Sequence, residues 1–141
     1  MNFTIVGPIL VLGLSAIGCS IGCGIAGAVS HAIMSRTEEA RAKYIAMSVA
    51  PSSQIIYGFV LMLKMTQSIQ AGSLDPLNAI GIGLFAGLSI MMSSIYQGKV
   101  CASGMQASIR TPAVYGLCWA SIGVIESFAL FSMVFSLMLI P

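Results

Sequence analysis

The feature that most constrains the fold of this chain is a series of four long apolar segments separated by short polar breaks. The segments run from about residue 5 to 34, 44 to 69, 77 to 109 and 112 to 140. Each exceeds the roughly 20 apolar residues that an α-helix needs to cross a bilayer. Only 7% of the residues are charged, against about 25% in soluble domains. The chain is therefore predicted to be an all-α integral membrane protein with four transmembrane helices.

The three breaks predict how these helices are connected. Residues 35–43 are polar and charged, residues 70–76 include Gly72 and Pro76, and Arg110-Thr111-Pro112 makes a tight reversal. They predict two tandem antiparallel hairpins, residues 1–75 and 76–141. Each hairpin pairs a helix rich in small residues with a bulkier one, so the halves look like a tandem repeat.

The basic residues predict the orientation in the membrane. Arg36, Arg41 and Lys43 lie in the first hairpin loop and Arg110 lies in the second. Because Lys and Arg concentrate in cytoplasmic loops, we expect both loops in the cytoplasm and both termini outside.

The first helix of each hairpin carries a stripe of glycines. Gly18 and Gly22 form a GxxxG pair, and Gly24 and Gly27 follow. The third helix has further small residues at Gly81, Gly83, Gly87, Ser94, Gly98 and Ala102. Small residues let helix backbones approach closely in lipid. The pattern is typical of any packed membrane bundle, and it also suits an oligomeric ring with a tight inner layer and a bulkier outer layer.

Glu126 is the only charged residue between 111 and 141. An acid near the bilayer centre costs on the order of 2.5–3.5 kcal/mol on insertion scales. Carboxylates kept at such a depth usually belong to an ion or proton pathway. The alternative is a protonated Glu that holds helices together by hydrogen bonds.

Two amides are predicted at the same depth as Glu126. Gln54 and Glu126 each follow a reversal by about 15 residues, and Gln97 precedes one by about 14, which places all three roughly 20–23 Å from the loops. Lys99 lies two residues beyond Gln97, so it should point away from this cluster.

Further oxygen atoms are expected beside the cluster. Pro51 lacks an N–H, and a kink there can expose backbone carbonyls such as that of Ala50. Ser53 offers a hydroxyl, and Tyr57, one turn on, can point its hydroxyl at the carboxylate. This set suits a hard cation such as Na⁺, whereas a lone buried Glu would suit a proton alone.

At these residues the chain resembles the proteolipid (c or K) subunit of V-type and A-type rotary ATPases in its duplicated four-helix form. The segments that carry the resemblance are residues 51–59, from Pro51 to Phe59, the run Gln97-Gly98-Lys99-Val100, and Glu126 within the last helix. They look like the ion-site segments of the sodium-coupled branch.

The resemblance implies a rotor ring of identical subunits in a bacterial or archaeal-type plasma membrane, with a stator membrane subunit and a central stalk as partners. It implies ion transport coupled to ATP hydrolysis or synthesis by those partners, with no organic cofactor and no nucleic acid. It matches the sodium ligands to Ala50 (through its carbonyl), Ser53, Gln54, Gln97 and Glu126, and Tyr57 to the residue that holds the Glu. Gln54 stands where many relatives carry a second acid, so one ion per four helices is expected.

Two other classes of protein are weighed against this one. A small secondary transporter would use the embedded Glu to grip an organic cation, and would surround it with aromatic residues rather than amides and hydroxyls. A purely structural four-helix protein leaves Glu126 without a role. The sequence has no Gly-rich phosphate loop followed by Lys-Ser/Thr, so this chain is not expected to cleave ATP itself.

Overall fold

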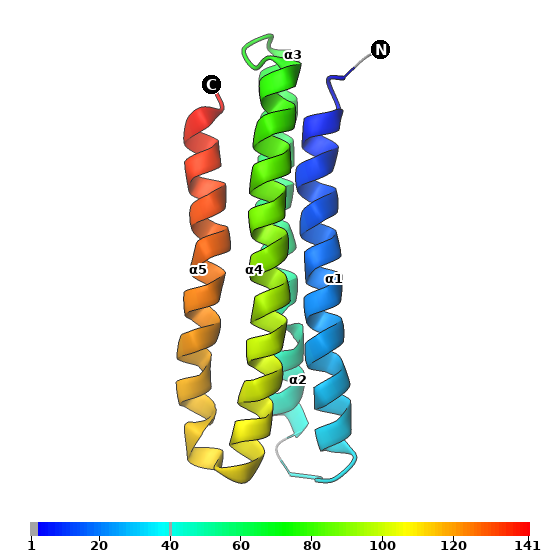
Figure 1. Cartoon of the computed structure of the whole chain (residues 1–141), viewed down its shortest axis with the longest axis vertical. Coiled ribbons are helices and arrows are strands. Elements are labelled where there is room, and N and C mark those ends of the chain that lie inside the picture. The colour runs from blue at the N-terminus through cyan, green and yellow to red at the C-terminus, as the bar shows by residue number, and fades with distance from the viewer. Residues whose placement is uncertain (1–2, 40) are drawn as a thin grey trace.

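All regular secondary structure in the described part of the chain, residues 3–39 and 41–141 of a computed structural model, is helical (Figure 1). Four helices within it are long and apolar enough to cross a membrane, Val6–Met34, Arg41–Gln70, Pro76–Arg110 and Pro112–Leu139. The predicted all-α fold of four apolar spans is confirmed. The individual elements are α1 (Val6–Met34), α2 (Arg41–Val49), a 3₁₀ segment η1 (Ala50–Gln54), α3 (Ile55–Gln70), α4 (Pro76–Arg110), a 3₁₀ turn η2 (Pro112–Val114) and α5 (Tyr115–Leu139).

The second span begins earlier than its hydropathy predicts. Arg41 and Lys43, expected in the loop, lie in the first turn of α2. Arg, Ala and Lys all favour helix, and charged side chains at a helix end can reach water. Ala40, within the predicted polar break, lies outside the described residues.

The turn between α3 and α4 is fixed by backbone and capping contacts. The Ser68 carbonyl accepts from the backbone N–H of Ser73 and of Leu74, at 3.0 and 3.2 Å, while Gly72 takes φ +70°. Asp75 then caps α4 by accepting from the backbone N–H of Leu77 at 2.9 Å. The division at residues 75 and 76 falls at this cap and stays a prediction.

Helices α1 and α4 run in the same direction and pack closely along their length (Figure 1). A Cβ added at Gly83 would collide with the Gly7 carbonyl, and one at Gly98 would collide with the Gly22 carbonyl. The predicted close packing is confirmed at Gly22, Gly83 and Gly98. At Gly24, Gly27 and Gly81, by contrast, an added Cβ would meet no neighbouring atom of the described residues within 4 Å.

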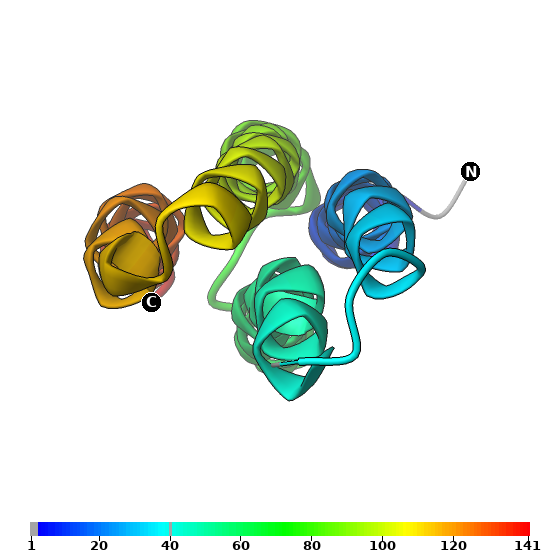
Figure 2. The ribbon, with the colours of Figure 1, turned by 90° about the horizontal axis from the view of Figure 1, so that it is seen from below.

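Helix α5 lies on the far side of α4 and makes no contact with α1 within the described residues (Figure 2). Only Ile122 and Ala129 of α5 are buried. The four spans therefore do not close into a bundle, and α5 presents a broad apolar surface that includes Leu117, Phe128, Phe131, Phe135 and Met138.

We call the end with the loops at residues 35–39 and 111–114 the loop end, and the opposite end, which holds the α3–α4 turn and the C-terminus, the turn end (Figure 1). One apolar core lies toward the turn end and includes Leu61, Met65, Ala86 and Ile90. A second lies toward the loop end and includes Ala26, Met47, Cys101 and Met105.

Candidate functional site

A layer of polar side chains separates the two apolar cores. On α4 the first core ends at Ile90 and the second begins at Cys101, and the buried residues between them include Ser93, Ser94 and Gln97. The other spans contribute Gln54 and Glu126 at this level, as their hydrogen bonds to Gln97 show. The predicted convergence of the two amides and the carboxylate is present.

The polar layer coincides with a change of helical winding in the middle of the second span. Residues Ala50–Gln54 form η1 around Pro51, and mid-helix 3₁₀ segments often mark functional positions. The Ala50 carbonyl, which a kink at Pro51 was expected to expose, accepts a hydrogen bond from Ser53 Oγ at 3.0 Å. The Pro51 carbonyl accepts one from Ser94 Oγ at 3.0 Å. This bond ties η1 to α4.

Three donors hold the Glu126 carboxylate. Ser53 Oγ donates to Oε1 at 2.6 Å and Tyr57 OH donates to the same atom at 3.0 Å. Gln97 Nε2 donates to Oε2 at 3.4 Å. Hydrogen bonds to an ionised group are stronger than neutral ones, so this set can stabilise a carboxylate inside a membrane.

Ala50 joins this group through its backbone. Ser53 Oγ lies 3.0 Å from the Ala50 carbonyl oxygen as well as 2.6 Å from Glu126 Oε1. A hydroxyl carries one hydrogen, so Ser53 donates to one of these acceptors at a time. Three oxygens therefore gather at one point, from a carbonyl, a hydroxyl and a carboxylate.

The two amides form a pair behind the carboxylate. Gln54 Nε2 donates to Gln97 Oε1 at 2.9 Å, and both side chains are fully buried. Gln54 Oε1 has no hydrogen-bond partner within the described residues. An unsatisfied buried carbonyl costs about 1–3 kcal/mol, so binding of a ligand to this oxygen would be favourable.

Two further serines of α4, beyond the predicted site residues, contact the backbone on either side of the site. Ser93 Oγ donates to the Ile125 carbonyl at 2.8 Å, next to Glu126, and Ser94 fixes η1 as described above. Both lie about one turn before Gln97 on α4. This spacing in the sequence indicates that they share a helix face with Gln97. Lys99 is exposed, with Nζ 4.8 Å from the centre of the Tyr96 ring, so it stays out of the site.

Comparison with known proteins identifies the family. The ATP synthase C-subunit family matches the chain twice, over residues 6–65 and 80–139. The chain belongs to this family. Each match covers one pair of spans, so the predicted tandem repeat is confirmed, and the protein is a duplicated proteolipid.

Two curated relatives of this proteolipid match most of the chain. The V-type sodium ATPase subunit K of Enterococcus hirae is 28% identical over 130 residues, which are 89% of this chain and 82% of the relative. The A-type ATP synthase subunit K of Methanocaldococcus jannaschii is 24% identical over 135 residues, 96% of this chain and 60% of the relative. As a family member, the chain is a non-catalytic, ion-translocating rotor subunit of a rotary ATPase, and members of this family form rings.

Proposed function

We propose that this proteolipid carries Na⁺ across the membrane in the rotor ring of a V/A-type ATPase, with Glu126 as the carrier. Ala50, Ser53, Gln54 and Gln97 supply the other oxygen ligands, and Tyr57 positions the carboxylate. The rotor function follows from membership of the family. What we propose is the identity of the ion and of the residues that bind it.

The observation that carries the sodium proposal is the surplus of oxygen around Glu126. The Ala50 carbonyl, Ser53 Oγ and Glu126 Oε1 lie together, and the fully buried Gln54 Oε1 has no hydrogen-bond partner among the described residues. Hard cations bind to oxygen ligands of this kind. Such a cage can replace the water that the ion loses on entering the membrane, and so offset the cost of dehydration.

The hydrogen bonds in the structure support a second role for these residues, which is to hold the Glu126 carboxylate when no ion is bound. With Ser53, Tyr57 and Gln97 donating to it, the carboxylate is satisfied by the protein alone. Gln97 turns its nitrogen toward Glu126 and its oxygen toward Gln54. Rotation of this amide would turn its oxygen toward a cation, so one set of side chains serves both a loaded and a closed form.

The alternative ion is H⁺, which needs only Glu126 and a hydrogen-bond partner. The E. hirae relative carries sodium in its name, which supports Na⁺, and the extra oxygens have no task in proton transport. The small secondary transporter is disfavoured because the family match covers both hairpins, whose duplication has no part in that mechanism.

The proposal extends to the assembly. The ring meets a stator membrane subunit and a central stalk, both hairpin loops face the cytoplasm, and each chain carries one ion because Gln54 replaces a second acid. The sidedness is motivated by the basic residues of the loop end, at Arg36, Arg41, Lys43 and Arg110.

The test is the reaction of Glu126 with a hydrophobic carbodiimide in the assembled ring. Carbodiimides react with the protonated acid, so an ion that binds the carboxylate slows the reaction. We expect added Na⁺ to slow labelling where K⁺ at equal ionic strength does not, and to do so more effectively as the pH rises. The Glu126→Gln variant gives the background labelling.

Equal labelling rates in Na⁺ and K⁺ across the pH range would show that the site takes protons only. Wild-type labelling no faster than that of Glu126→Gln would show that another carboxyl group reacts, and would remove Glu126 from the carrier role.

A further inference from the structure

A pocket outside the polar layer opens between α1 and α4 at the loop end, where the two helices lie side by side (Figure 2). Its volume is about 550 Å³, within the range of about 300–1,000 Å³ that is typical of ligand pockets. The polar residues of its lining are Arg36, Gln106 and Arg110, and the apolar ones include Val29, Ile33 and Ile109.

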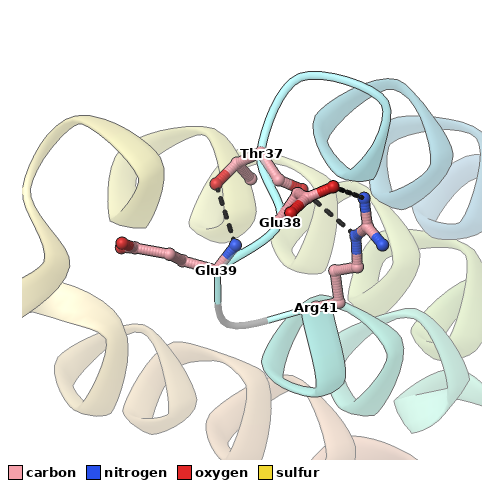
Figure 3. Close-up of polar contacts among 4 residues, drawn as sticks. All are labelled: Thr37, Glu38, Glu39 and Arg41. Atoms are coloured by element: carbon pink, nitrogen blue, oxygen red, sulfur yellow. Dashed lines mark hydrogen bonds and ion pairs between the residues drawn. The ribbon is translucent and has the colours of Figure 1, made fainter.

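The charge of this pocket is wholly positive. Both arginines are exposed, and neither belongs to the ion pair found among the described residues. No acidic residue of the described part of the chain lines the pocket. The nearby Glu38 faces Arg41 instead, at 3.9 Å (Figure 3), and Glu39 lines a different pocket with Lys43 and Tyr115.

An apolar path leads from the pocket toward the middle of the membrane. Ala28 and Ala32 of α1 line the pocket, and Ile21 and Ile17 are exposed, at 42% and 50%. Because a helix repeats every 3.6 residues, positions 17, 21, 28 and 32 share one face. The arginines at one end suit the phosphate of a phospholipid headgroup, and the continuous apolar face below them suits its acyl chains.

We propose that this pocket binds the headgroup of an anionic phospholipid, with Arg36 and Arg110 on its phosphate and the acyl chains along α1. Basic pockets between transmembrane helices recognise anionic headgroups, and the planar guanidinium group binds phosphate in a bidentate manner. An acidic peptide segment would use the arginines but not the apolar face that continues into the membrane. The lipid is therefore the occupant that the whole lining fits.

The assembled ring allows a direct test by native mass spectrometry. Rings of wild type and of Arg36→Gln/Arg110→Gln are transferred from vesicles of equal phosphatidylglycerol and phosphatidylcholine content into detergent, and the retained lipid is counted. The matched control is Arg41→Gln/Lys43→Gln, which removes two charges from the same end of the molecule but outside this pocket. Arg41 is held by Glu38 and by the Thr37 carbonyl, to which its Nε donates at 3.2 Å (Figure 3).

We expect the pocket variant to bind phosphatidylglycerol about 30-fold more weakly, from the loss of two cations at the membrane surface. The control should retain it, and phosphatidylcholine should be unaffected in all three proteins. Unchanged phosphatidylglycerol retention in the pocket variant overturns the proposal. So does an equal loss in the control, which would reflect surface charge in general.

Two further outcomes identify other occupants and also overturn the proposal. If inorganic phosphate displaces phosphatidylglycerol at equal concentration, the pocket recognises a free anion and the apolar face has no part in it. If the pocket variant keeps its lipid but no longer associates with the soluble part of the ATPase, the arginines bind a protein. Neither outcome depends on which ion Glu126 carries.

Discussion

Glu126 has a complete set of hydrogen-bond donors supplied by the chain itself. Ser53 and Tyr57 both reach Oε1, from η1 and α3, and Gln97 reaches Oε2 from α4. Without such partners a buried charge would be very costly. These donors from the second and third spans stabilise the carboxylate within the membrane. They also connect α5 to those two spans.

The first prediction is that Glu126→Gln abolishes ion transport and leaves the ring assembled. The two side chains have nearly the same shape, and removing a charge lowers the cost of membrane insertion. The amide oxygen can still accept from Ser53 and Tyr57. ATP-driven ion uptake into reconstituted vesicles measures the first effect, and the mass of the purified oligomer measures the second. Uptake near the wild-type rate would contradict the assignment of Glu126 as the carrier.

The second prediction separates the stability of the amide pair from its ion-binding role. Gln97→Leu leaves both polar atoms of the Gln54 amide buried without partners, so we expect a loss of about 1–3 kcal/mol in stability. Gln54→Leu/Gln97→Leu removes both amides, so its stability should return part of the way to wild type, because Glu126 Oε2 still lacks the Gln97 donor. The thermal stability of the purified ring measures this difference.

Sodium protection of Glu126 against carbodiimide should be lost in both of these amide variants. Protection that persists in the double variant would exclude the two amides as ligands, even though the stability result stood.

At the scale of the elements, η1 shows what the sequence could and could not predict. Pro51 marks the place where the second span departs from α-helical winding, and the residue count places Gln54, Gln97 and Glu126 at one level. The Pro51 carbonyl of this 3₁₀ segment accepts a hydrogen bond from Ser94 of α4. That contact needs η1 and α4 close together, a tertiary condition that local propensity does not encode.

The tight reversal at residues 110–112 predicts α5 beside α4, but the face of α5 that packs on α4 was not predictable from its sequence. Transmembrane helices are apolar on the side that faces lipid as well as on the side that faces protein, so periodicity does not mark the packed face. The contacts of Ser93 with the Ile125 carbonyl and of Gln97 with Glu126 fix that face in the structure.

The third prediction concerns the α1–α4 contact. Gly98→Ala places a methyl group against the Gly22 carbonyl, and overpacking of this kind costs about 1–3 kcal/mol. Because Gly98 adjoins Gln97, sodium protection of Glu126 should weaken too. Gly116→Ala is the matched control, since the added Cβ would meet no neighbouring atom of the described residues within 4 Å. Comparing the thermal stabilities of the two rings tests this, and an equal loss in both would contradict the packing argument.

For the molecule as a whole, the two hairpin loops share one end (Figure 1), so they must lie on the same side of the membrane. The fourth prediction is that this side is the cytoplasm. Ser35→Cys and Ala113→Cys place exposed thiols at that end, in a chain whose four native cysteines are replaced. An impermeant thiol reagent should label inverted vesicles and leave intact cells unlabelled, and labelling of intact cells would reverse the orientation.

The fifth prediction is that each chain carries a single ion. The two hairpins are repeats of one family unit, yet Gln54 of the first is neutral and bonds to Gln97, while Glu126 of the second supplies the charge. Exhaustive reaction with a hydrophobic carbodiimide should therefore add one adduct per chain by intact mass, and none in Glu126→Gln. A second adduct within the spans would contradict this.

One carrier for every four helices has a mechanical consequence. For a ring of given circumference, fewer ions cross the membrane in each turn, so each ATP moves fewer charges. Moving one charge costs about 2.3 kcal/mol per 100 mV. The free energy of each ATP is then divided among fewer ions, so more of it is available for each ion. Such a ring can drive its ion against a steeper gradient, which favours pumping. A measured ratio of ions to ATP as high as that of a ring with a carboxylate in every hairpin would contradict the single-carrier assignment.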